Sequence, residues 1–206
     1  MNETMKLVEL LADKRAVLFD FDGPVCDVFA GLRASDIAAD LVALLRRLDV
    51  EMTPVLAAER DPMAVLRFAA TAEPAVTRAV EDALCAAELA AVDMARPTRG
   101  GVETVLACLA AGKVAAVVSN NSAAAVHRYL DSHDLTGTVW PVVGRPYAEP
   151  DRMKPSPEPL ERTLAQLPVA AGEAVLIGVC RSRWKTASGG LNWVPVPRTR
   201  RHIGQS

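Results

Sequence analysis

The sequence contains no long apolar run. No stretch approaches the roughly 18 apolar residues that span a membrane, and residues 1–13 alternate apolar and charged side chains, unlike a signal peptide. The formal net charge is only -2, so the chain as a whole offers no basic surface for a nucleic acid or an anionic membrane. We therefore expect a soluble cytoplasmic protein with no nucleic-acid partner and no membrane partner.

Closely spaced cysteines are also missing. The four cysteines lie far apart, at positions 26, 85, 108 and 180, with no C-x-x-C pair. This spacing favours neither a zinc site nor a small disulfide framework. The histidines His127, His133 and His202 share no ligand spacing either. We expect reduced, mostly buried thiols and histidines at the surface.

Short apolar runs and helical patterns alternate along most of the chain. Strands are predicted at residues 16–19, 114–118, 139–143 and 174–177, and helices at 5–11, 102–111, 122–130 and 157–167. Strands separated by helices of this length indicate βαβ units and a parallel sheet. The predicted fold class is α/β, with a Rossmann-like parallel sheet. Pro141 suits an edge strand better than a central one.

The region from residue 28 to residue 95 has a different character. Apolar residues recur at helical spacing through most of it, and Pro54, Pro62 and Pro74 fall where new helices would begin. We predict an all-helical cap at residues 28–95, inserted after the first strand, in a core made of residues 1–27 and 96–206. The alternative is that these helices belong to the core itself.

Polar side chains follow the predicted strands at the edge where parallel sheets place catalytic groups. Asp20 and Asp22 follow the first strand, Ser119 and Asn120 follow the second, and Lys154 precedes the helix that leads to the fourth. One carboxylate can attack phosphorus while the other exchanges protons with the leaving group. The serine and the lysine can hold phosphoryl oxygens and neutralise their charge. Two carboxylates facing a phosphate dianion require a hard cation such as Mg²⁺.

The order D-F-D-G, V-V-S-N and M-K-P-x-P, over residues 14–178, resembles the haloacid dehalogenase superfamily. More narrowly, it is similar to the phosphoglycolate phosphatase and β-phosphoglucomutase branch, which also places a helical cap after the first motif. The resemblance implies that Asp20 forms an aspartyl-phosphate and that Asp22 is the general acid and base. It further implies a Mg²⁺ ion held by these two carboxylates.

The same resemblance implies the groups that bind the substrate. Ser119 would bind the transferring phosphoryl group, and Asn120 and Gly23 would lie against the substrate. Lys154 would neutralise Asp20 and the phosphate together. Each residue also has a purely structural alternative. Asp20 and Asp22 could be loop or helix-capping carboxylates, Ser119 a turn residue, and Lys154 a solvated surface lysine.

The fourth motif of the family is incomplete in this sequence. It should carry two acids after the fourth strand, but Val179 and Arg183 stand in their places, and residues 178–206 contain no Asp or Glu. The loss should weaken metal binding. Three explanations for the lack of acids in residues 178–206 remain: translation in a shifted reading frame, true divergence of the lineage, or a basic tail that binds nucleic acid. The gene decides the first: without an alternative frame that encodes G-D-x-x-x-D, the frameshift hypothesis fails. At most, residues 193–197 could form a short edge strand, which predicts lower stability or dimerisation through the exposed edge.

Three functions follow from these observations. The first is a magnesium-dependent phosphatase that hydrolyses a small phosphorylated metabolite, with its metal held by other groups where the acids are lost. The second is a catalytically impaired member of the fold that acts as a binding or interaction protein. The third is a phosphomutase. Dehalogenation is disfavoured, because dehalogenases do not need Asp22. The protein would be a monomer or a homodimer.

Overall fold

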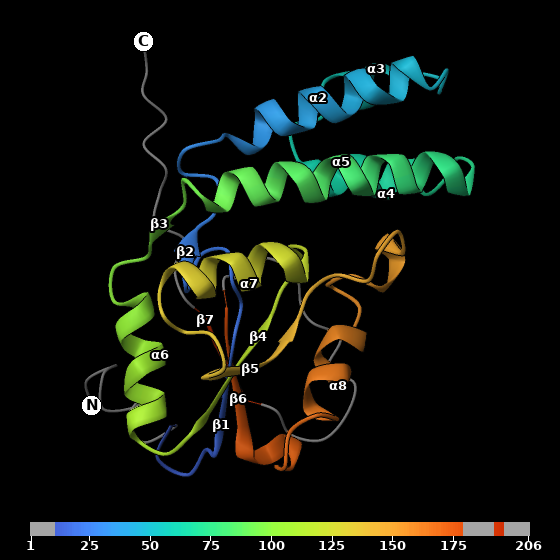
Figure 1. The fold of residues 1–206 in the computed structure, drawn as a ribbon. Coiled ribbons are helices and arrows are strands. Elements are labelled where there is room, and N and C mark those ends of the chain that lie inside the picture. Colours follow the sequence, from blue (N-terminus) through green and yellow to red (C-terminus); the bar gives the residue numbers. More distant parts are fainter. Residues whose placement is uncertain (1–10, 179–191, 196–206) are drawn as a thin grey trace.

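The computed structural model describes residues 11–178 and 192–195, and its centre is a parallel sheet (Figure 1). Among the described residues the sheet has five strands in the order β5-β4-β1-β6-β7. They are β1 (Ala16–Phe19), β4 (Val114–Val118), β5 (Val139–Val143), β6 (Ala174–Gly178) and β7 (Asn192–Pro195). Every neighbouring pair is parallel. The α/β fold class with a Rossmann-like sheet is confirmed.

Alternating residues of each strand face opposite sides of the sheet. Val17 and Phe19 pack into one core cluster, and Ala16 and Leu18 pack into the other. Both faces are apolar because helices cover both, which is why the strands are continuous apolar runs. At the carboxyl edge, Phe19 pairs with Val117 of β4 and with Ile177 of β6.

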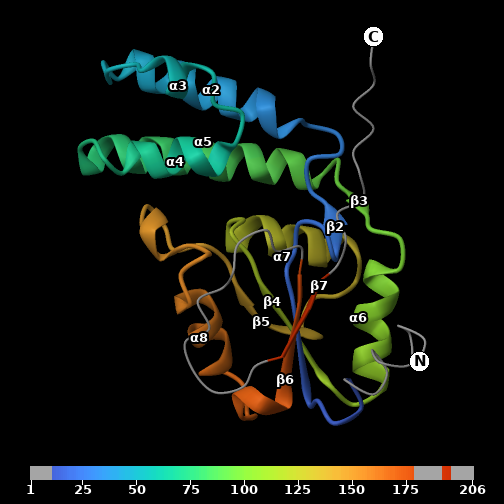
Figure 2. The same ribbon diagram turned by 180° about the vertical axis from the view of Figure 1, so that it is seen from behind.

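The core helices lie on the two faces of this sheet (Figures 1 and 2). They are α6 (Gly101–Ala110), α7 (Ala123–Ser132) and α8 (Glu158–Leu164), with short 3₁₀ turns η1 (Pro150–Arg152) and η2 (Ala171–Glu173). Helices α6 and α7 pack on the face of Val17, and α8 packs on the face of Leu18. Ser122 caps α7 by accepting a hydrogen bond from the Ala125 amide at 3.3 Å.

Four helices fill the segment that we predicted to be a cap, and we call them the cap helices. They are α2 (Ala34–Arg47), α3 (Pro54–Ala57), α4 (Pro62–Ala69) and α5 (Pro74–Val92). As predicted, a proline begins each of the last three. Thr53 and Asp61 cap α3 and α4 by accepting hydrogen bonds from the amides of Leu56 and Met63. Proline suits this position because the first amides of a helix have no partner within it.

The chain enters and leaves the cap helices side by side. Strand β2 (Cys26–Asp27) pairs antiparallel with β3 (Arg96–Pro97), and the cap helices lie beyond the end of the sheet where β2 follows β1 (Figures 1 and 2). The sequence did not predict this short ladder. The boundaries at residues 28 and 95 stay a prediction. In the described part of the chain, no helix is long and apolar enough to cross a bilayer.

Strand β7 lies at one edge of the sheet and β5 at the other. In the described part of the chain, the prediction of an edge position for Pro141 is confirmed. The short edge strand predicted at 193–197 is observed at Asn192–Pro195, and residues 196 and 197 lie outside the described residues. Cys26, Cys85 and Cys108 are free thiols. The predicted helix at residues 5–11 and the fourth-motif positions Val179 and Arg183 lie outside or largely outside the described residues.

Candidate active site

Asp20 follows β1 directly and lies at the carboxyl edge of the sheet. Its amide donates to the Ile177 carbonyl of β6 at 2.8 Å, which extends the sheet pairing by one residue. Its Oδ1 accepts a hydrogen bond from the Phe21 amide at 2.9 Å and an ion pair from Lys154 Nζ at 2.6 Å. No hydrogen bond from the described residues reaches its Oδ2. The side chain is 22% exposed, so the carboxylate is fixed at one oxygen and accessible in part.

Lys154 connects the ends of β1 and β4. Besides Asp20, its Nζ donates to the Val118 carbonyl at 2.7 Å, and its side chain is only 10% exposed. The backbone of Lys154 is also held, because Asn120 accepts from its amide at 2.8 Å and donates to its carbonyl at 3.1 Å. The alternative of a solvated surface lysine is wrong. A cation is fixed beside the carboxylate of Asp20.

Asp22 and Gly23 form the turn after Asp20. Asp22 Oδ1 accepts a hydrogen bond from the Val28 amide at 3.2 Å. Gly23 has a φ of 115°, a region that glycine adopts without the steric cost of a side chain. The Gly23 amide donates to the Cys26 carbonyl at 2.7 Å, and its own carbonyl accepts from Thr98 Oγ1 at 2.5 Å. These contacts make Gly23 a turn residue, and its predicted substrate contact stays a prediction.

Ser119 is almost completely buried, with 1% of its surface exposed. Its amide donates to the Val143 carbonyl of β5 at 2.9 Å. Its Oγ donates to Asn121 Oδ1 at 3.1 Å and accepts from the Asn121 amide at 3.0 Å. To bind a phosphoryl oxygen as predicted, the hydroxyl proton would have to turn away from Asn121. The side-chain amide of Asn120 is bonded to the Lys154 backbone, and its predicted substrate contact stays a prediction.

The predicted residues therefore lie around one edge of the sheet. Direct hydrogen bonds join Lys154 to Asp20 and to Asn120. Asp22 follows β1, as Asp20 does, and Ser119 follows β4. When both aspartates are ionised, they and Lys154 sum to one net negative charge at this edge of the sheet. This charge balance, with oxygen ligands only, fits a hard divalent cation. The fit is partial, because the described residues contain no cluster of three or more His, Cys, Asp or Glu side chains that could hold a metal.

Sequence reasoning missed a buried ion cluster that adjoins this edge. Arg145 Nε donates to Glu81 at 2.7 Å, and its NH1 donates to Glu88 at 2.6 Å. The three side chains are at most 1% exposed. Burial would lower the pKa of the Arg145 guanidinium, but the charges of Glu88 and Glu81 outweigh burial and raise it. The rule that found Asp20 and Ser119, polar side chains just after a strand, could have found Arg145, which follows β5 by two residues.

Comparisons with known proteins identify the family of this chain. The sequence matches the family model of haloacid dehalogenase-like hydrolases over residues 14–178, and the chain belongs to that family. It is therefore an enzyme of a hydrolase family, as the motifs had predicted. No curated protein matches the sequence.

Solved structures that share this fold include one bound to phosphate and two predicted phosphatases. The first is CbbY of Rhodobacter sphaeroides in complex with phosphate, at 15% identity and a TM-score of 0.57, covering 80% of this chain and 77% of that one. A predicted phosphatase of Clostridium acetobutylicum has 15% identity and a TM-score of 0.55, with 80% and 76% covered. A predicted phosphoglycolate phosphatase of Haemophilus somnus has 15% identity and a TM-score of 0.54, with 81% and 77% covered. At these identities the likeness concerns the fold.

Proposed function

We propose that the protein is a magnesium-dependent phosphatase that hydrolyses a small phosphate monoester through an aspartyl-phosphate on Asp20. The observation that carries the proposal is the ion pair of Lys154 Nζ with Asp20 Oδ1 at 2.6 Å. A lysine fixed beside a partly exposed carboxylate can balance the charge of an incoming phosphoryl group. Family membership and a fold shared with two predicted phosphatases support the same reaction class.

In the first step the Asp20 carboxylate attacks phosphorus, and the bond between phosphorus and the ester oxygen breaks. Asp22, in its protonated form, donates a proton to the leaving oxygen, so that an alcohol departs. In the second step the Asp22 carboxylate takes a proton from water, which attacks phosphorus and releases phosphate and the free Asp20 carboxylate. Lys154 and Ser119 hold the phosphoryl oxygens in both steps.

Magnesium would be held by Asp20 and Asp22, where it would neutralise charge between the carboxylates and the phosphate. The sequence offers valine and arginine where the family has two further acids, at positions 179 and 183. We therefore expect weaker magnesium binding than a complete motif would give. The proposed substrate is a small phosphorylated metabolite. We propose no nucleic-acid partner and no membrane partner.

The test is phosphate release from p-nitrophenyl phosphate at increasing magnesium concentration, beside the variants Asp20→Asn and Asp22→Asn. We expect turnover that requires magnesium and is abolished by Asp20→Asn. Turnover that Asp20→Asn leaves unchanged would exclude an aspartyl-phosphate on this residue.

The second candidate is a catalytically impaired protein that binds a phosphorylated ligand without hydrolysing it. The acids lost at positions 179 and 183 favour it. It predicts that a folded wild-type protein has no turnover, and that the double substitution Val179→Asp and Arg183→Asp restores magnesium-dependent turnover. If the wild-type protein already turns over at a low magnesium concentration, this candidate is wrong.

A further inference from the structure

The cap helices touch the loop of Lys154 through Arg67 of α4. One Arg67 guanidinium nitrogen donates to the Lys154 carbonyl at 3.0 Å. That same carbonyl accepts the Asn120 side chain at 3.1 Å. Arg67 is half-buried. It bonds to the backbone carbonyl of Lys154, while the Lys154 ammonium bonds to Asp20.

A second contact joins α5 to the loop of Ser119. Glu88 Oε1 accepts a hydrogen bond from Asn121 Nδ2 at 3.1 Å, and Glu88 Oε2 accepts one from the Ser122 amide at 2.9 Å. The Asn121 carbonyl oxygen Oδ1 then accepts the hydroxyl of Ser119 at 3.1 Å. One asparagine therefore lies between a cap carboxylate and the hydroxyl predicted to bind the phosphoryl group.

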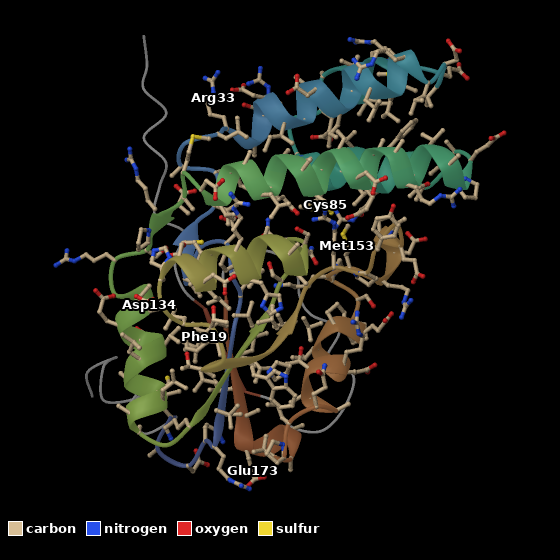
Figure 3. The ribbon with its side chains drawn as sticks, in the orientation of Figure 1. Phe19, Arg33, Cys85, Asp134, Met153 and Glu173 are labelled. Atoms are coloured by element: carbon tan, nitrogen blue, oxygen red, sulfur yellow. The ribbon has the colours of Figure 1, made fainter. Side chains whose placement is uncertain are left out.

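The ion cluster of Arg145, Glu81 and Glu88 fixes this second contact. Arg145 NH1 also donates to the Asn120 carbonyl at 3.0 Å, so the cluster holds α5 and the loop after β4 together. Figure 3 labels Cys85 of α5 and Met153 of the Lys154 loop, in the region between the cap helices and the core. A fully buried ion cluster is weak evidence for stability alone, because desolvation offsets much of its attraction. The cluster lies between α5 and the loop after β4, which indicates that it fixes the position of one relative to the other.

We propose that Arg67 and Glu88 are positioning residues, through which the cap helices hold Lys154 and Ser119 in their reactive arrangement. The inference rests on the proposed phosphatase function. Neither residue needs to touch the substrate. Displacing the cap helices would break both contacts and release both loops, so the full rate requires cap helices seated as they are here.

The test compares kcat and KM for p-nitrophenyl phosphate in Arg67→Ala, Arg67→Lys and Glu88→Gln. The matched control is Arg128→Ala, which removes another contact between α7 and the end of α5, the pair of Arg128 with Asp93 at 2.6 and 2.7 Å. We expect Arg67→Ala and Glu88→Gln to lower kcat about tenfold with KM nearly unchanged, and Arg67→Lys to recover most of the loss. Arg128→Ala should keep the wild-type kcat. Equal kcat values in Arg67→Ala and Arg128→Ala would overturn the proposal.

Hydrogen exchange separates this proposal from the proposed function, because it requires no turnover. We expect faster exchange of the Lys154 amide in Arg67→Ala and of the Ser122 amide in Glu88→Gln, and neither change in Arg128→Ala. If the wild-type protein shows no turnover but these changes occur, the phosphatase function fails while the positioning contacts stand. Unchanged exchange at both amides in these variants would contradict the positioning role.

Discussion

Lys154 is held within the site at both its ammonium and its backbone. Its ammonium bonds to Asp20 and to the Val118 carbonyl, and its backbone bonds to Asn120 and Arg67. A side chain held at both ends loses little further freedom when substrate binds, which favours catalysis by a prearranged charge.

The substitution Lys154→Met tests that charge directly. We expect kcat for an aryl phosphate to fall by roughly a hundredfold or more, because the methionine keeps the length of the side chain and removes its charge. The matched control is Lys113→Met, since the Lys113 ammonium also bonds to backbone carbonyls, those of Leu11 and Lys14, but forms no ion pair with a carboxylate of the residues that the structure describes. A similar kcat in the two variants would mean that the Lys154 charge does not act in the reaction.

The thiols give a second prediction at the residue scale. Burial raises the pKa of Cys26, Cys85 and Cys108, and that of Cys85 to about 12. A higher pKa lowers the fraction of reactive thiolate at pH 8. In a Cys180→Ser protein we expect slow reaction with a disulfide reagent at pH 8, and rapid reaction of all three thiols once urea unfolds the chain. Rapid reaction of the folded protein would show that these thiols are accessible.

At the scale of the elements, helix α5 bonds to the core through two buried acidic side chains. Glu81 and Glu88 lie on one face of it, seven residues apart, and both bond to Arg145. Removing the arginine leaves two buried carboxylates without a counter-charge.

We expect Arg145→Met to lower the free energy of unfolding by about 3–5 kcal/mol, measured by urea denaturation. The exposed pair of Arg128 and Asp93 provides the comparison, since Arg128→Ala should cost no more than about 1 kcal/mol. Equal losses in the two variants would contradict the view that burial makes the Arg145 cluster different.

The loop after β5 passes very close to the start of α7. A Cβ atom at Gly144 would lie 2.3 Å from the Ala123 amide nitrogen and 2.8 Å from the Asn121 carbonyl oxygen. These are backbone atoms, so Gly144→Ala must displace either the loop or the start of the helix. We expect a loss of about 1–3 kcal/mol in unfolding free energy, together with a lower kcat, because Asn121 adjoins Ser119. In the control Gly172→Ala, the added Cβ meets nothing within 4 Å, and both quantities should stay near wild type. A Gly144→Ala protein as stable and active as that control would contradict the close approach.

The positions of the elements could be predicted where local chemistry decides them. The strands at 16–19 and 114–118 are buried on both faces, so each is an unbroken apolar run with the predicted bounds. The edge strand at 139–143 also has the predicted bounds, but it is buried on one face only, because Trp140 is exposed on the other. The helix predicted at 157–167 is shorter in the structure, which ends α8 at Leu164. Apolar spacing continues past that residue, and the spacing alone does not mark where hydrogen bonding stops.

The sequence predicted at which edge of the sheet the site residues lie, but it did not predict which hydrogen bonds they form. The rule that catalytic groups follow parallel strands brought Asp20, Ser119 and Lys154 to one edge of the sheet. It could not show that Asn120 bonds to the Lys154 backbone, because that pairing depends on how two loops far apart in the chain meet. Glu81 and Glu88 escaped notice because acidic residues on a helix usually face solvent.

At the scale of the whole molecule, the cap helices and the sheet meet where the predicted catalytic residues gather. The cap contacts through Arg67 and Glu88 reach the loops that follow β4 and precede α8. If the proposed phosphatase function holds, cap helices in this position would limit water around the phosphoryl group.

The most direct test of the central claim is phosphate release from p-nitrophenyl phosphate, measured against magnesium concentration in the wild-type protein and in Asp20→Asn. Our account predicts turnover that rises with magnesium and is lost in the variant, in proteins that melt at similar temperatures. A folded wild-type protein whose phosphate release does not exceed that of Asp20→Asn at any magnesium concentration would contradict it.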